Sequence, residues 1–215
     1  MSVVIRPLRF TTDVDAMRAF LERLGLRSRI ESERGGWVDM LAGRGMVGLH
    51  DAATSSTGGK PGTSLSFEAD NLDAVQDRLE QLGFVDGTVF DEAYGRVLSV
   101  TAPDGVVIWI DQRSDDLYGY KLHDARPDDR WSVTPALTGA EQPPWRRFLN
   151  GLGLELSELP VRFGPATGQF AVGLELTTTE DLTDVHNRLT DLPVTRTGNT
   201  LQITDPDGQL VVVHG

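Results

Sequence analysis

Apolar and polar residues follow two periods along the first 112 residues of the chain. The segment DAMRAFLERLGL, residues 15–26, has apolar residues three and four positions apart, which predicts a helix with one buried face. The segment DAVQDRLEQLGF, residues 73–84, repeats it with Asp, Ala, Leu, Glu, Leu and Gly at matching positions. Two copies of one structural unit are therefore expected here.

Short extended runs surround each of these helices. One run precedes each helix, at residues 3–11 and 63–69. Three runs broken by turn residues follow each helix, at residues 27–33, 35–43 and 45–51 in the first unit and 87–93, 95–104 and 105–111 in the second. The predicted order of elements is strand, helix and three strands, βαβββ, in both units.

The remainder of the chain repeats this pattern in a shortened form. The turn TAPDG at 101–105 recurs as TDPDG at 204–208, and the segment before the first helix recurs from residue 133. The third unit is shorter by roughly one hairpin, so we expect it to be truncated. Residues 113–130 are polar and charged and are typical of a linker or covering arm. We therefore predict a first domain at 1–112, a linker at 113–130 and a second, shortened domain at 131–215.

Composition removes several classes of function. The chain has 215 residues, no cysteine and a formal net charge of −12. Disulfides, thiolate metal sites and a cysteine nucleophile are excluded. The negative charge disfavours nucleic acid and membrane surfaces as partners. No apolar run is long enough to span a membrane, so we expect a cytoplasmic protein.

The repeated units resemble the vicinal oxygen chelate superfamily, which includes glyoxalase I, extradiol dioxygenases, fosfomycin-resistance enzymes and bleomycin-binding proteins. The resemblance rests on the repeat, on the helix that closes with FLERLGL from Phe20, and on the PDG turn before each closing strand. It implies an α+β fold with tandem βαβββ units that pair into two curved mixed sheets, with the helices outside and the third unit truncated. In enzymatic members the cleft between paired units holds a divalent metal, with one ligand from the first strand and one from the last strand of each unit.

The positions that match these metal ligands carry unsuitable side chains. In the first half they are Arg6, Gly48, Ser64 and Trp109. A guanidinium has no lone pair to donate, and glycine and tryptophan offer no side-chain ligand. Two of the matching positions in the second half carry Thr134 and Val212. We therefore expect no metal and no cofactor, and the Lewis-acid mechanism of the family would be lost.

An enzyme remains an alternative, and the sequence leaves this question open. His50, Glu68 and Asp111 share the cleft-facing side, and a histidine with two carboxylates could hold a displaced metal. A metal-independent enzyme could instead use Glu68 or His50 as a general base.

A binding cleft is the main prediction for the first half. Alternation along the strands turns ten residues inward: Arg6, Leu8, Phe10, His50, Ser64, Ser66, Glu68, Val107, Trp109 and Asp111. The candidate ligand-binding residues among them are Arg6, Phe10, His50, Ser64, Glu68, Trp109 and Asp111. Trp109 would stack on a flat or cationic group, and Arg6 would pair with an anion. In the alternative, Trp109 and Phe10 fill the cleft as core and Arg6 extends to its rim. Arg9 points away from the cleft by alternation, which is unusual for a charged residue.

Three functions follow from these observations. The first is a metal-free protein that binds a small organic molecule, aromatic or cationic, in the manner of the drug-sequestering members of the superfamily. The second is an enzyme of the glyoxalase or dioxygenase kind, and the third is a non-catalytic scaffold whose clefts have filled. Because the two halves already supply paired units, we expect a monomer or a weak homodimer.

Overall fold

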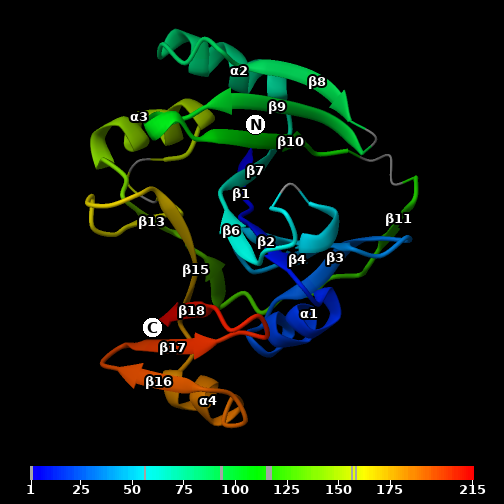
Figure 1. Cartoon of the computed structure of the whole chain (residues 1–215), viewed down its shortest axis with the longest axis vertical. Helices are drawn as coiled ribbons and strands as arrows, with labels where there is room; N and C mark the ends of the chain where they lie inside the picture. The colour runs from blue at the N-terminus through cyan, green and yellow to red at the C-terminus, as the bar shows by residue number, and fades with distance from the viewer. Residues whose placement is uncertain (1, 56, 93, 115–117, 156, 158) are drawn as a thin grey trace.

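The chain folds into three β-sheets with helices against them (Figure 1). The structure is a computed structural model that describes residues 2–55, 57–92, 94–114, 118–155, 157 and 159–215. In this part of the chain, no helix has both the length and the apolar character needed to cross a membrane.

The first sheet has five strands, and helix α2 (Leu72–Gln81) packs on one of its faces. The strands in spatial order are β1 (Val3–Ile5), β7 (Ser66–Ala69), β10 (Val107–Gln112), β9 (Gly95–Thr101) and β8 (Thr88–Glu92). The pair β7 and β10 is parallel and the other pairs are antiparallel. The mixed sheet agrees with the predicted fold class.

The second sheet has six strands, and helix α1 (Val14–Arg23) packs on it. The strands in spatial order are β11 (Tyr120–Leu122), β3 (Arg27–Ser32), β4 (Trp37–Leu41), β5 (Met46–Asp51), β2 (Leu8–Thr11) and β6 (Gly62–Ser64). A short 3-10 turn, η1 (Ala52–Thr54), follows β5. The edge strand β11 belongs to the segment predicted as a linker or covering arm, and it pairs with β3.

The third sheet contains the C-terminal part of the chain, with α3 (Gln142–Leu152) and α4 (Leu182–Asn187). Its strands in spatial order are β14 (Arg162–Phe163), β13 (Ala136–Thr138), β15 (Ala171–Thr178), β18 (Leu210–His214), β17 (Thr200–Thr204) and β16 (Val194–Thr197), while β12 (Trp131–Val133) also pairs with β15. Between α3 and β15 the described residues form only the short strand β14. The third unit is therefore truncated, as predicted.

The two strands predicted before the helices are each divided between the first two sheets. The run at 3–11 splits into β1 and β2, because Pro7 has no N–H to donate and the chain changes sheets there. The run at 63–69 splits in the same way at Leu65, into β6 and β7. The predicted continuous strands were wrong in this detail. The crossing matters because it places Arg6 between the two sheets.

The two halves are joined through their closing turns. The carboxylate of Asp104, in the turn η2 (Pro103–Gly105), accepts a hydrogen bond from the indole of Trp145 at 2.7 Å. The matching carboxylate of Asp207 accepts from the hydroxyl of Thr12 at 2.7 Å and from its backbone N–H at 3.0 Å. The repeated PDG turn therefore contacts the other half of the molecule in both copies.

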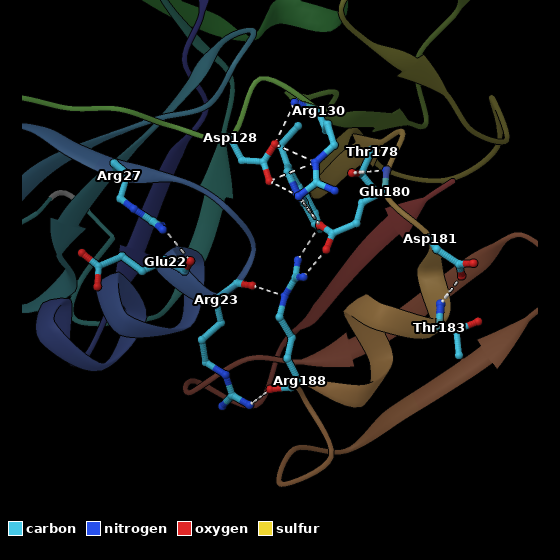
Figure 2. Close-up of polar contacts among 11 residues, drawn as sticks. Glu22, Arg23, Arg27, Asp128, Arg130, Thr178, Glu180, Asp181, Thr183 and Arg188 are labelled. Carbon is cyan, nitrogen blue, oxygen red and sulfur yellow. Dashed lines mark hydrogen bonds and ion pairs between the residues drawn. The ribbon is translucent and has the colours of Figure 1, made fainter.

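A polar cluster joins α1 to α4 (Figure 2). The guanidinium of Arg188 donates to the backbone carbonyl of Arg23 at 2.7 Å and to the carboxylate of Glu180 at 2.8 Å. Glu180 also accepts from the indole of Trp131 at 3.1 Å, and Trp131 is fully buried. Arg23 in turn donates to Asp191 at 2.9 Å. These contacts fix the two halves relative to each other.

Candidate functional site

A cavity of about 640 Å³ lies between the first and second sheets, and we call it the inter-sheet cavity. All seven candidate ligand-binding residues line it: Arg6, Phe10, His50, Ser64, Glu68, Trp109 and Asp111. The other three residues predicted to face inward, Leu8, Ser66 and Val107, line it as well. Ligand binding by these residues stays a prediction, but the structure brings them together.

The strand registers explain why the cavity collects these side chains. Trp109 lies beside Ser66, and Asp111 beside Glu68, across the parallel pair β10 and β7. The intervening residues Ile108 and Ile110 are buried on the helix side of the sheet. The alternation read from the sequence therefore holds for the closing strand β10.

The sequence reading missed other residues that line the cavity, among them Arg29, Trp37, Asp39, Glu92, Tyr94 and Tyr120. Trp37 and Asp39 lie on β4, directly beside His50 and Gly48 of β5. Trp37 and Asp39 are two positions apart and therefore face the same side of the strand, and this alternation could have identified both residues. Tyr120 lies in the segment expected to be a linker, so no periodicity marked it.

An ionic network forms the polar floor of the cavity. The guanidinium of Arg6 makes an ion pair and hydrogen bond with Asp111, and its Nη1 lies 3.7 Å from Oδ2 of Asp39. Glu68 accepts from Arg29 at 2.8 Å and from Arg113 at 2.8 Å. Although burial opposes the change, these two arginines lower the pKa of Glu68. Arg6, Asp39 and Glu68 are each less than 5% exposed.

The structure gives Arg6 partners within the protein, which argues against its expected role as the partner of an anionic ligand. Its guanidinium is already paired with Asp111 and lies beside Asp39. Burial lowers the pKa of Arg6, but the two carboxylates outweigh this and raise it. The arginine therefore compensates part of the carboxylate charge of the cavity.

Three buried polar atoms on the cavity wall have no hydrogen-bond partner within the described part of the chain. They are Nε of Arg6, Oδ1 of Asp39 and Oγ of Ser66. An unpartnered buried polar atom costs about 1 to 3 kcal/mol, so such atoms are normally satisfied by a ligand or by water. Their presence together favours a polar contact with a bound molecule.

Residues 4–110 match the family model of the Glyoxalase/Bleomycin resistance protein/Dioxygenase superfamily. The chain belongs to this superfamily. Comparison with curated proteins gives no match.

Solved structures share the fold over nearly the whole chain. A catechol 2,3-dioxygenase is 16% identical with a TM-score of 0.64, covering 98% of this chain and 86% of its own. The Mn(II)-bound glyoxalase from Novosphingobium aromaticivorans is 16% identical with a TM-score of 0.58, covering 98% and 80%. An extradiol ring-cleaving dioxygenase from B. fuscum is 14% identical with a TM-score of 0.65, covering 99% and 70%. At these identities the likeness shows the fold of the superfamily alone.

The four positions that we matched to the superfamily's metal ligands carry side chains that do not suit a metal. Arg6 brings a permanent positive charge to the first of them, where it is held by Asp111. At Gly48 a Cβ atom would lie only 2.8 Å from Leu8 and 3.2 Å from the ring of Trp37, so the packing leaves little room for a ligating side chain. Trp109 offers no ligand atom, and the hydroxyl of Ser64 is the only candidate donor of the four.

The displaced metal set is not assembled either. Glu68 is held by two arginines and Asp111 by Arg6. The Nδ1 atom of His50 lies 2.9 Å from the carbonyl oxygen of Asp51, and its ring packs against Phe10. Across the described ranges, no three histidine or acidic side chains are grouped as a metal site. The suggestion that His50, Glu68 and Asp111 form one was wrong in its geometry.

Asp39 is the carboxylate with the most perturbed titration in the cavity. Burial raises its pKa from 3.8 to about 6, against the opposing effects of Arg6 and Arg29. Between pH 3.8 and about pH 6, Asp39 therefore keeps its proton in the folded chain and loses it in the unfolded chain. The protonated Asp39 carboxyl therefore contributes to the free energy of unfolding at low pH, and this contribution is lost as the pH rises to about 6.

Urea unfolding of the wild type and Asp39→Asn at pH 5 and pH 7.5 tests this assignment. Asparagine removes the cost of ionising a buried carboxyl. From pH 5 to pH 7.5, the free energy of unfolding of the variant should therefore rise by about 1 to 2 kcal/mol relative to that of the wild type. The other carboxylates titrate in both proteins and cancel in the difference. A difference that stays constant with pH would contradict the raised pKa.

Proposed function

We propose that the chain is a small-molecule-binding member of the superfamily, whose inter-sheet cavity binds an organic ligand without a metal. The mode would be sequestration of the kind that the bleomycin-resistance branch suggests. The observation that carries this proposal is an open cavity of about 640 Å³ whose lining includes Arg6, Ser64 and Trp109, three of the positions that we match to the family's metal ligands. Cavities of this size suit small organic molecules.

The state of Trp109 supports binding over the scaffold alternative. Its side chain is 41% exposed and lines the cavity, so it does not fill the space as core. Phe90 packs edge-on against it, with ring centroids 5.8 Å apart, which leaves a face of the indole for stacking. A scaffold would have no need of an exposed tryptophan at this position.

A metal-independent enzyme is the second candidate, and Asp39 favours it over the bases suggested by the sequence. A general base works best with a pKa near the working pH, and the pKa of Asp39 is raised to about 6. The lowered pKa of Glu68 makes that residue a weaker base. Recovery of a bound ligand in chemically altered form would favour this candidate over sequestration.

A thermal-shift screen with divalent cations and with planar aromatic compounds tests the proposed function. We expect stabilisation by organic compounds and none by the metals. For a compound that binds, Trp109→Ala should weaken the affinity about tenfold, because the stacking surface is lost. Val85→Ala, which removes an exposed apolar side chain outside the cavity, serves as the control. Equal affinity in wild type and Trp109→Ala would sink the stacking role.

A further inference from the structure

The charges that line the inter-sheet cavity do not balance. Among the residues that the structure describes, four carboxylates line it, from Asp39, Glu68, Asp111 and Glu92, against the two guanidinium groups of Arg6 and Arg29. Arg113 adds a third cation behind Glu68, and the carboxylates still exceed the cations. An anionic ligand would meet net repulsion here, whereas a cationic ligand would reduce the imbalance.

The phenols of the cavity report the same negative potential. Burial raises the pKa of Tyr94, and the charges of Asp111 and Glu92 raise it further. Burial also raises the pKa of Tyr120, with added effects from Asp39 and Asp111. Tyr94 comes directly before β9 and Tyr120 begins β11, so the negative potential extends across the cavity.

Oδ1 of Asp39 is the one buried carboxylate oxygen of the cavity that has no hydrogen-bond partner among the described residues. Both oxygens of Glu68 accept from arginines, and Asp111 is paired with Arg6. Oδ2 of Asp39 lies 3.7 Å from Arg6, beyond hydrogen-bond range, and Oδ1 has no partner although Asp39 is only 3% exposed. The unpartnered hydroxyl of Ser66 lines the same cavity.

Aromatic side chains surround this polar floor. The ring of Trp37 lies against the Arg6 guanidinium, 5.5 Å from the ring centroid, and meets His50 edge-on at 5.5 Å. Trp109 and Tyr94 line the more exposed part of the cavity. A flat ring system would contact these walls while a polar group reaches the floor.

We propose that the ligand of the inter-sheet cavity is a planar aromatic cation, whose N–H group donates a hydrogen bond to Oδ1 of Asp39. This inference rests on the proposed function and narrows it to one class of ligand. In this arrangement Arg6 positions Asp39 and Asp111 and does not itself bind the ligand's charge. The hydroxyl of Ser66 provides a second polar contact.

Three acridines with one ring system test the charge preference by calorimetric titration at pH 7.5 in moderate salt. They are 9-aminoacridine as the cation, acridine as the neutral probe and acridine-9-carboxylate as the anion. We expect one equivalent of 9-aminoacridine to bind at least tenfold more tightly than acridine, and the carboxylate to bind most weakly. Asp39→Asn should remove this preference, measured in the variant as the ratio of its affinities for 9-aminoacridine and acridine.

Asp15→Asn is the matched control, because it makes the same change of charge at a side chain that is 90% exposed and outside the cavity. It should leave all three affinities unchanged, which excludes general attraction to an acidic protein. Equal binding of the neutral and cationic probes, or cation binding that survives Asp39→Asn, would overturn the inference and leave the proposed function standing. Failure of all three probes to bind would count against both.

Discussion

Replacing Arg9 with alanine is expected to lower the free energy of unfolding by about 3 to 5 kcal/mol. Arg9 is 1% exposed and makes an ion pair with Asp205, which is 4% exposed and lies in the other half of the chain. Its guanidinium also donates to Gln209 and, at 3.0 Å, to Thr63. The variant would leave the carboxylate of Asp205 buried without its cation, which is the costly outcome.

Urea unfolding measures this loss, and Arg126→Ala provides the control. Arg126 makes an ion pair with Asp124, but both side chains are more than 80% exposed, so its removal should change stability by less than about 1 kcal/mol. The double variant Arg9→Met with Asp205→Leu should recover much of the loss, since no uncompensated charge remains. Equal stabilities of Arg9→Ala and Arg126→Ala would show that the buried pair does not join the halves as described.

Replacing Arg6 with methionine should cost a similar amount, about 3 to 5 kcal/mol at pH 8, because Asp39 and Asp111 lose their shared cation. Methionine keeps most of the side-chain volume, so the loss reports on charge. The loss should be smaller below pH 6, where Asp39 takes up a proton. Unfolding curves at pH 5 and pH 8 measure the difference.

The double variant Arg6→Met with Asp39→Asn separates this effect from simple packing damage. Removing both charges should restore part of the stability at pH 8, which gives a favourable coupling between the two positions. Strictly additive losses would mean that Arg6 does not balance the charge of Asp39, and the ionic description of the cavity floor would fail.

The side of each strand that faces the cavity could be predicted because the period of a strand is two. This is why Phe10, Glu68 and Trp109 were assigned to one cleft from the sequence. The same rule turned Arg9 away from the cavity, and in the structure Arg9 is buried and does not line the cavity. Local periodicity carries this information without any knowledge of how the sheets pack.

The partners of the charged residues could not be predicted in this way. Asp205 lies 196 residues after Arg9, and it occupies the one position where the turn TDPDG differs from TAPDG. Arg6 was expected to be free for an anion, but the chain crosses between sheets at Pro7 and brings it to Asp39 of β4. Such pairs depend on the relative placement of sheets, which no local pattern encodes.

The central claim is that the inter-sheet cavity binds an organic cation without a metal, and one titration tests it directly. The chain is treated with EDTA and titrated with 9-aminoacridine, with and without added Mn²⁺. We predict one binding site with the same affinity in both conditions. Binding that appears only when Mn²⁺ is present would contradict the claim.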